Sequence, residues 1–268
     1  MSSDQYTLHL FPFSLYSLFS RFAYVLGRSS LKDEPDRLAL ALKLVNLHRH
    51  ENLSEHFLRL NPKGQVPVLT GGSLAEPVVG SLNVSLYLCK YYPRLLPASH
   101  EAVIRETLSQ LHAFHARPLS VPAQDVGKAY PCAADALLSR HDIGEGHRRL
   151  LELKKDFHDT HMKEITSVEN FHVTETMVRA LGVTLLGIYK DDGSPWLFGE
   201  AVGPTVLDAH VTALYARLVD NHRGDLIPEK LQRYTEQMRA GPEWRGMLRG
   251  RSTIWNSSVG DVDKLDEW

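Results

Sequence analysis

The chain has 268 residues, of which 43% are hydrophobic, and its 30 lysines and arginines nearly balance its 32 aspartates and glutamates. This composition predicts a globular protein with one large domain or two modest ones. The sequence has no long basic run, which argues against a nucleic-acid partner, and no apolar run approaches the roughly 18 residues of a membrane-spanning helix.

The first 93 residues alternate between strand and helix patterns. Apolar and polar side chains alternate at residues 6–10, which is typical of a strand. The segment from Ser17 to Leu26 has a helical pattern, and Ser17 is a residue type that caps helices. The predicted order is strand, helix, strand, helix, strand, strand, helix, over residues 6–10, 17–26, 38–45, 52–60, 64–69, 73–76 and from 81 onward.

A proline interrupts the predicted strand Gly64–Leu69, GQVPVL. Proline cannot donate a hydrogen bond to a neighbouring strand, so within a sheet Pro67 belongs at an edge, a strand start or a bulge. The pair Gly71-Gly72 is a hairpin signal. It predicts that the chain turns there into a second short strand at Ser73–Glu76.

The rest of the chain has helical patterns. Residues 93–99 contain two prolines and predict a linker, so we expect one domain over residues 1–93 and an all-helical domain over 100–268. Thr205, followed three positions later by Asp208, resembles a capping box at a helix start. Two stretches rich in proline, glycine and alanine, at 118–135 and 190–203, give no clear prediction.

Cysteine and histidine usage give further expectations. Cys89 and Cys132 form no Cys-x-x-Cys pair, and the N-terminus lacks the features of a signal peptide, so we expect a cytoplasmic protein. The closest histidine pairs, at 48 and 50 and at 158 and 161, come with neither a His-Glu-x-x-His pattern nor a nearby cysteine set. We therefore expect no metal site.

Four segments, in order, resemble the cytosolic glutathione S-transferase superfamily. They are Phe57–Leu69, close to the motif F-x-x-x-N-P-x-G-x-V-P-x-L; Ser81–Leu88, similar to S-x-A-I-x-x-Y-L; Trp196–Gly199 leading into Thr205-x-x-Asp208; and Trp244-Arg245. The resemblance implies an α/β, thioredoxin-like N-terminal domain that binds glutathione. It also implies an all-α C-terminal domain with the electrophile site, and a homodimer.

Two further segments resemble the zeta class, the maleylacetoacetate isomerase type. Residues 50–57 align without gaps up to Pro67, and Arg117-Pro118-Leu119 is similar to the class's Gln-Pro-Leu. The long C-terminal tail and an insert near residues 28–36 resemble fungal members that act on secondary metabolites. The resemblance therefore implies glutathione as co-substrate and a small electrophilic molecule from secondary metabolism as its partner.

The resemblance also implies which residues bind glutathione. Its cysteinyl amide would pair with the backbone of Val66, turned outward by a cis bond to Pro67. Ser81, at a helix start, would hold the γ-glutamyl carboxylate. The acid that most members place before this serine is replaced by Gly80. The other residues implied to bind glutathione are Asn52, Gln65 and Arg117.

A hydroxyl group near the start of the first helix would stabilise the glutathione thiolate. Alignment of Arg21-Phe22 with the family's Arg-Val favours Ser17, with Tyr16 and Ser14 as rivals; Ser17 also has the simpler interpretation of a helix cap. The loop has no cysteine, which argues against the omega and glutaredoxin-like branches. The side chains expected to line the electrophile pocket include Phe13, Phe114 and His115.

The expected chemistry is addition of the activated thiol to an electrophilic unsaturated molecule. If the adduct is retained, the enzyme is a glutathione transferase. If the adduct rotates and then expels the thiolate, the enzyme is a cis–trans isomerase that consumes no glutathione. A third hypothesis is a non-catalytic binding module with the same fold, which the glycine at position 80 favours.

Overall fold

The computed structural model describes residues 5–31, 38–121 and 123–265. Four strands form one mixed sheet in the order β2–β1–β3–β4. Strand β1 is parallel to β2 and antiparallel to β3, and β3 is antiparallel to β4. The strands are β1 (Tyr6–Leu10), β2 (Leu40–Leu44), β3 (Val68–Gly71) and β4 (Val78–Val79).

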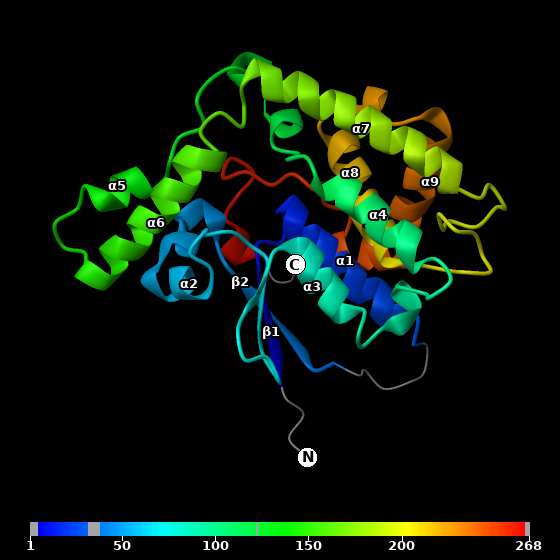
Figure 1. The fold of residues 1–268 in the computed structure, drawn as a ribbon, viewed down its shortest axis with the longest axis horizontal. Coiled ribbons are helices and arrows are strands. Elements are labelled where there is room, and N and C mark those ends of the chain that lie inside the picture. The colour runs from blue at the N-terminus through cyan, green and yellow to red at the C-terminus, as the bar shows by residue number, and fades with distance from the viewer. Residues whose placement is uncertain (1–4, 32–37, 122, 266–268) are drawn as a thin grey trace.

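Helix α1 (Leu15–Ser29) connects the parallel strands and packs against both α3 (Ser81–Leu88) and α8 (Val206–Asp220) (Figure 1). The helix begins before the predicted start, so the prediction that Ser17 caps it was wrong. Ser14 is the N-cap residue, because its carbonyl accepts the first helical hydrogen bond from the Leu18 N–H at 2.9 Å.

The segment between β2 and β3 has more turns than predicted. The predicted helix at 52–60 is a 3₁₀ turn, Glu51–Leu53, followed by α2 (Glu55–Leu60). Ser54 separates the two, because its side chain accepts a hydrogen bond from the Phe57 N–H and caps α2. A further 3₁₀ helix, Leu47–Arg49, follows β2.

Pro67 stands directly before β3, and the Val66–Pro67 bond is cis as predicted. The predicted hairpin is present, because β3 and β4 are consecutive antiparallel strands with Gly72 in their connection. The position of its second strand was wrong: β3 pairs with Val78–Val79, and residues 73–76 form no strand. Beyond Gly71 the chain stays hydrogen-bonded to the residue that precedes β1, because the Gly72 N–H donates to the carbonyl of Gln5 at 3.1 Å. A Cβ at Gly72 would lie 2.1 Å from the ring of Tyr6, so this glycine permits close packing.

The chain after β4 is helical in the part that the structure describes, which confirms the predicted fold class. A 3₁₀ helix, Pro93–Leu95, lies in the predicted linker. Helices α5 and α6 extend away from the other helices and lie beside α2 (Figure 1). The remaining α-helices are α4 (Glu101–His112), α5 (Ala134–Leu138), α6 (Glu145–His161), α7 (Val168–Ile188), α9 (Glu229–Ala240) and α10 (Pro242–Leu248).

Helix α8 forms the centre of the helical half, and its predicted capping box is present. The buried carboxylate of Asp208 accepts hydrogen bonds from the N–H groups of Leu197 and Thr205, both at 2.8 Å, and from the Thr205 and Tyr234 hydroxyls. These bonds tie the preceding loop and α9 to the first turn of α8. They therefore fix the helix that carries part of the cavity described below.

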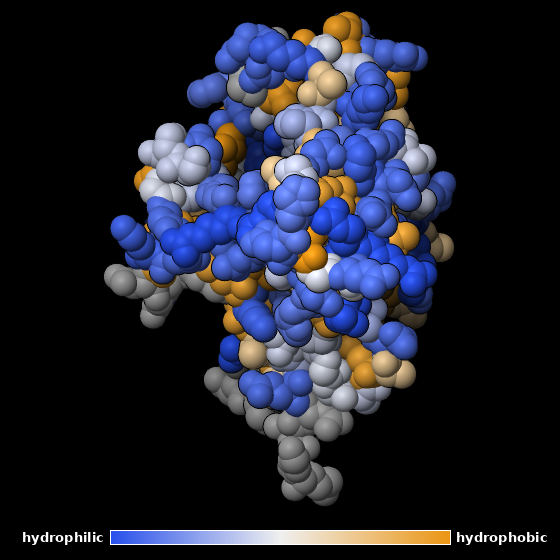
Figure 2. All heavy atoms as spheres, turned by 90° about the vertical axis from the view of Figure 1, so that its left-hand side faces the viewer, coloured by the Kyte–Doolittle hydropathy of each residue, from blue (hydrophilic) through white to orange (hydrophobic). Residues whose placement is uncertain are grey.

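The face formed by α5, α6 and neighbouring segments is largely hydrophilic, with hydrophobic side chains in separate small patches (Figure 2). Within residues 5–31, 38–121 and 123–265, no helix has both the length and the apolar character required to cross a membrane.

Candidate active site

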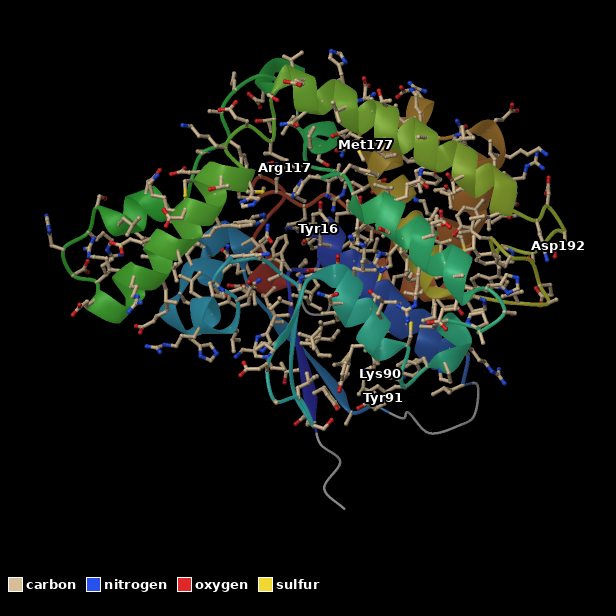
Figure 3. The ribbon with its side chains drawn as sticks, viewed as in Figure 1. Tyr16, Lys90, Tyr91, Arg117, Met177 and Asp192 are labelled. Carbon is tan, nitrogen blue, oxygen red and sulfur yellow. The ribbon has the colours of Figure 1, made fainter. Side chains whose placement is uncertain are left out.

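A cavity of about 1060 Å³ lies between the β1–α1 loop and the helical half. Figure 3 labels Tyr16, on α1, and Arg117, after α4, which both line it. Its aromatic lining residues are Phe11, Phe13, Tyr16, Tyr130, Phe171 and Trp255. Its charged lining residues, histidines aside, are Arg117, Arg217, Asp220 and Arg223.

The cavity contains only part of the site predicted from the sequence. Five of the predicted residues line it: Phe13, Ser14, Tyr16, His115 and Arg117. The others lie outside its lining: Ser17, Asn52, Gln65, Val66, Pro67, Gly80, Ser81 and Phe114.

The predicted serines of the β1–α1 loop have different environments. Ser17 is fully buried, and its hydroxyl accepts the Phe11 N–H at 3.3 Å. Ser14 lies on the cavity wall at the start of α1, and its hydroxyl makes no capping bond to the helix. Of the two, only Ser14 presents an uncommitted hydroxyl to the cavity, next to the positive end of the α1 dipole.

The Tyr16 hydroxyl also lies at the cavity wall and accepts the Ala116 N–H at 3.4 Å. Burial raises the pKa of Tyr16 to about 12, so the phenol is protonated at neutral pH. Because its oxygen accepts this bond, its own hydrogen is free to be donated to a bound molecule.

The predicted glutathione-binding residues near β3 lie outside the cavity lining. Among the described residues, the backbone N–H and C=O of Val66 have no hydrogen-bond partner. Ser81 is the first residue of α3, after Gly80, whose φ of +86° is accessible mainly to glycine. Apart from its two chain neighbours, no described residue has an atom within 4 Å of the position that a Gly80 Cβ would take. The start of α3 is therefore open beside Gly80.

Two predicted ligand residues, Asn52 and Gln65, take part in the hydrogen bonds that hold the loop before β3. The Asn52 amide donates to the Gly64 carbonyl at 2.8 Å, and the Asn61 amide donates to the Gln65 carbonyl at 2.7 Å. Asn52 therefore has a positioning role through its NH₂ group, which leaves its carbonyl oxygen as the group available for a ligand.

A chain of four hydrogen bonds joins the start of α3 to the helical half. His112 Nε2 contacts His210 Nδ1 at 3.0 Å, and His210 Nε2 contacts the Ser85 hydroxyl at 2.9 Å. Ser85 donates to Ser20 at 3.4 Å, and Ser20 donates to the Ser81 carbonyl at 3.1 Å. Because a carbonyl only accepts, the chain has one direction, and both histidines carry their proton on Nε2.

The C-terminal segment, residues 251–265, crosses the cavity. Thr253 is buried and donates from its N–H and its hydroxyl to Asp220, at 2.7 and 2.8 Å. Trp255 stacks on Phe13 with ring centroids 4.9 Å apart. Farther along, Asp261 and Asp263 pair with Arg49 in the N-terminal half.

Sequence reasoning missed the role of Arg217 on α8. Its Nη2 donates to the carbonyls of Phe13 at 2.6 Å and Thr253 at 2.8 Å, and its Nε donates to the Thr253 hydroxyl. Arg217 thus joins the β1–α1 loop to the C-terminal segment. A strongly basic residue in a helix whose other residues are mostly buried was the only available signal.

No group of three or more metal-ligating side chains occurs among the residues that the structure describes. Burial, with a smaller contribution from the positive charge of Arg117, lowers the pKa of His115 to about 4, so this cavity histidine is neutral at neutral pH.

No protein-family model matches the chain. Over 98 residues the chain is 36% identical to glutathione S-transferase 1 of Dianthus caryophyllus. The match covers 36% of this chain and 40% of that protein, so the chain spans about two-fifths of the length of this curated relative.

Solved structures resemble the whole described fold. A maleyl pyruvate isomerase, described as a bacterial glutathione S-transferase of the zeta class, has a TM-score of 0.54 at 20% identity, over 90% of this chain and 95% of its own. The β-etherase of Sphingobium sp. strain SYK-6 has a TM-score of 0.58 at 17% identity, over 92% and 100%. Maleylacetoacetate isomerase from Anaeromyxobacter dehalogenans 2CP-1, with bound glutathione, has 0.52 at 18%, over 92% and 96%. The chain has the glutathione S-transferase fold.

Proposed function

We propose that this protein is a glutathione transferase-type enzyme that activates the glutathione thiol for addition to an electrophilic unsaturated molecule. The Ser14 hydroxyl carries the proposal: it lies at the start of α1, has no capping role and lines the cavity. A hydroxyl donor and a helix N-terminus both favour the thiolate over the thiol. This position moves the proposed thiolate donor from Ser17 to Ser14, with Tyr16 as its rival.

In this proposal, glutathione lies along the surface between β3 and α3 and reaches the cavity with its thiol. The cysteinyl amide pairs with the backbone of Val66, and the γ-glutamyl carboxylate binds at Ser81 beside Gly80. The Gln65 and Asn52 side chains lie toward the glycyl end. The unpaired Val66 backbone and the open space beside Gly80 support this placement.

The chemical step starts when the thiol releases its proton to solvent water and the Ser14 hydroxyl donates a hydrogen bond to the resulting thiolate. The sulfur then forms a bond to one carbon of a conjugated double bond, and the electron pair of that bond moves to the adjacent activating group. If the resulting anion is protonated, the product is a conjugate and glutathione is consumed. If it rotates and re-forms the double bond, thiolate leaves and the net reaction is isomerisation.

Isomerisation is the second candidate, and the isomerases among the structural neighbours favour it. Glutathione loss per turnover distinguishes the two reactions, because conjugation removes one glutathione for each product and isomerisation removes none. Homodimerisation, a cytoplasmic location and a secondary metabolite as acceptor are further parts of the proposal. Light scattering during size-exclusion chromatography tests the dimer.

The central experiment measures glutathione binding by calorimetry and by melting temperature at millimolar glutathione. A binding heat and a rise in melting temperature are expected, since a ligand that binds only the native state stabilises it. Absence of both in the wild-type protein would contradict the enzyme proposal and favour the non-catalytic module. Ser81→Ala should weaken binding about tenfold, by loss of a hydrogen bond to a charged group.

A further inference from the structure

The cavity carries positive charge that the protein itself does not balance. Arg217 makes three hydrogen bonds, all to uncharged oxygen atoms of Phe13 and Thr253. Asp220, one turn further along α8, accepts hydrogen bonds from Arg239, Ser252 and Thr253 instead. Among the described residues, no carboxylate contacts the Arg217 guanidinium, and its Nη1 has no partner.

Arg117 is a second cation of this kind. Its guanidinium lies 4.9 Å from the ring centroid of Tyr130, and within the described part of the chain it pairs with no acid. Burial, opposed by the charge of Asp220 and aided by the charge of Arg117, lowers the pKa of Arg217 to about 10. Arg217 therefore remains a cation at neutral pH, and Arg117 is close enough to act on it.

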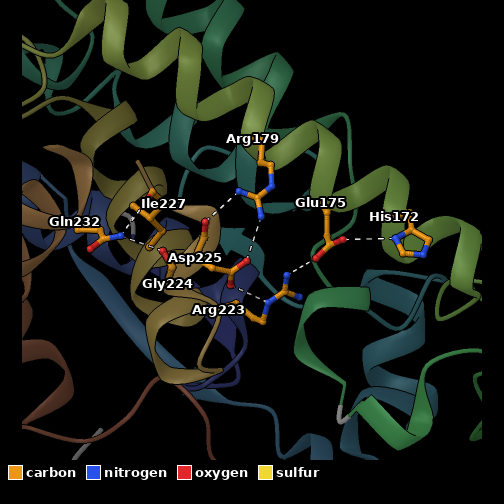
Figure 4. Close-up of polar contacts among 8 residues, drawn as sticks. All are labelled: His172, Glu175, Arg179, Arg223, Gly224, Asp225, Ile227 and Gln232. Carbon is orange, nitrogen blue, oxygen red and sulfur yellow. Dashed lines mark hydrogen bonds and ion pairs between the residues drawn. The ribbon is translucent and has the colours of Figure 1, made fainter. Parts of the chain in front are cut away.

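Arg223 also lines the cavity, but its charge is paired with carboxylates. It pairs with the carboxylates of Glu175 and Asp225, and Asp225 also pairs with Arg179 (Figure 4). Two guanidinium groups and two carboxylates thus neutralise one another at this edge of the cavity. Among the described residues, Arg117 and Arg217 are the cavity-lining arginines that no carboxylate contacts.

The surroundings of these two arginines suit a flat molecule with an anionic group. The free hydrogen of the Tyr16 hydroxyl can be donated to an anion, and the phenol itself remains neutral. Trp255, stacked on Phe13, and Tyr130 supply aromatic surfaces at the same cavity. Desolvated cations are costly unless paired, so an anion bound here removes that cost and places its rings against the aromatic side chains.

We propose that the cavity binds an acceptor that is a planar aromatic or conjugated acid, with its anionic group at Arg117, Arg217 and Tyr16 and its rings against Trp255. This assignment rests on the proposed function, because it names the second substrate of that site. The same anion-binding groups could instead hold a carboxylate of glutathione, so the test must separate the two sources.

The test compares two fluorescent probes of the same aromatic skeleton: anilinonaphthalene sulfonate, an anion, and N-phenyl-naphthylamine, which is neutral. The variants are Arg117→Gln and Tyr16→Phe, and the control is Arg94→Gln, which removes a cation that does not line the cavity. Arg117→Gln should weaken the anionic probe about tenfold and Tyr16→Phe about fivefold. Neither should weaken the neutral probe by more than about twofold, and the control should change neither.

Three results would overturn the assignment. If Arg117→Gln weakened the binding of both probes equally, the arginine would contribute packing and not charge recognition. Unchanged binding of the anion in both variants would place its site elsewhere. Displacement of the anionic but not the neutral probe by saturating glutathione would assign the subsite to glutathione itself. A failure of the proposed function is a different observation, since it requires that wild-type protein bind no glutathione.

Discussion

Replacement of Ser14 by alanine tests the proposed thiol activation directly. The Ser14 side chain makes no capping bond to α1, so Ser14→Ala should change the free energy of unfolding by less than about 0.5 kcal/mol. A hydrogen bond to a charged group contributes about 1.5–3 kcal/mol, and 1.36 kcal/mol corresponds to about one pKa unit. Loss of the hydroxyl should therefore raise the pKa of bound glutathione by about one to two units.

The assay is a pH titration of the thiolate ultraviolet absorbance of the glutathione complex, with urea unfolding of each variant. Ser54→Ala is the matched control, because the Ser54 side chain does accept a helix N–H, from Phe57 at 3.3 Å. That variant should lose about 1 kcal/mol of stability with no change in the thiol pKa. An unchanged pKa in Ser14→Ala, together with a raised one in Tyr16→Phe, would refute the assignment and make Tyr16 the donor.

Three further predictions concern stability and specificity. Burial lowers the pKa of His112 to about 4, below its value in the unfolded chain. The free energy of unfolding should therefore fall as the pH drops from about 6.5 to 4, by up to about 1.4 kcal/mol per pH unit. In urea unfolding, His112→Gln should show a shallower fall. Asp208→Ala should cost about 3–5 kcal/mol in the same assay, because it removes the acceptor of four buried donors; a loss below about 1 kcal/mol would contradict the role of the capping box. Trp255→Ala should raise the KM for the acceptor severalfold and leave glutathione affinity within about twofold, as steady-state kinetics and calorimetry would show; a parallel loss of both would mean that Trp255 shapes the whole site.

Local chemistry made the order of elements predictable from the sequence. The alternation at residues 6–10 and the Thr205–Asp208 pair each have a short-range physical cause, and each was confirmed. The cis bond before Pro67 was implied by the family resemblance, and it is present. The Gly71-Gly72 pair marked the connection of a hairpin correctly, but the second strand begins later than predicted, at Val78. Gly72 also serves close packing, which the pattern did not indicate. Here the ring of Tyr6, distant in sequence, occupies the space beside Gly72.

The candidate site was less predictable because its parts come from distant segments. The choice between Ser14 and Ser17 depends on a helix start, which sequence patterns locate only to within a few residues. Arg217 becomes a site residue only because the fold brings it to the Phe13 carbonyl and Thr253. The distinction between Arg223, which is neutralised, and Arg117, which is not, likewise depends on contacts made by folding.

The C-terminal segment is attached near both of its ends, by different kinds of contact. Near its start, the buried Thr253 is held by Asp220 and Arg217. Near its end, the ion pairs of Asp261 and Asp263 are made with an Arg49 side chain that is 55% exposed, and exposed pairs are weak and screened by salt. Between these acids Val262 is fully buried, and the buried Asn46 amide donates to Asp263 at 2.8 Å. Added salt should therefore weaken the Arg49 ion pairs but leave the end of the segment held beside the cavity. Ligand entry to the cavity should accordingly depend little on ionic strength.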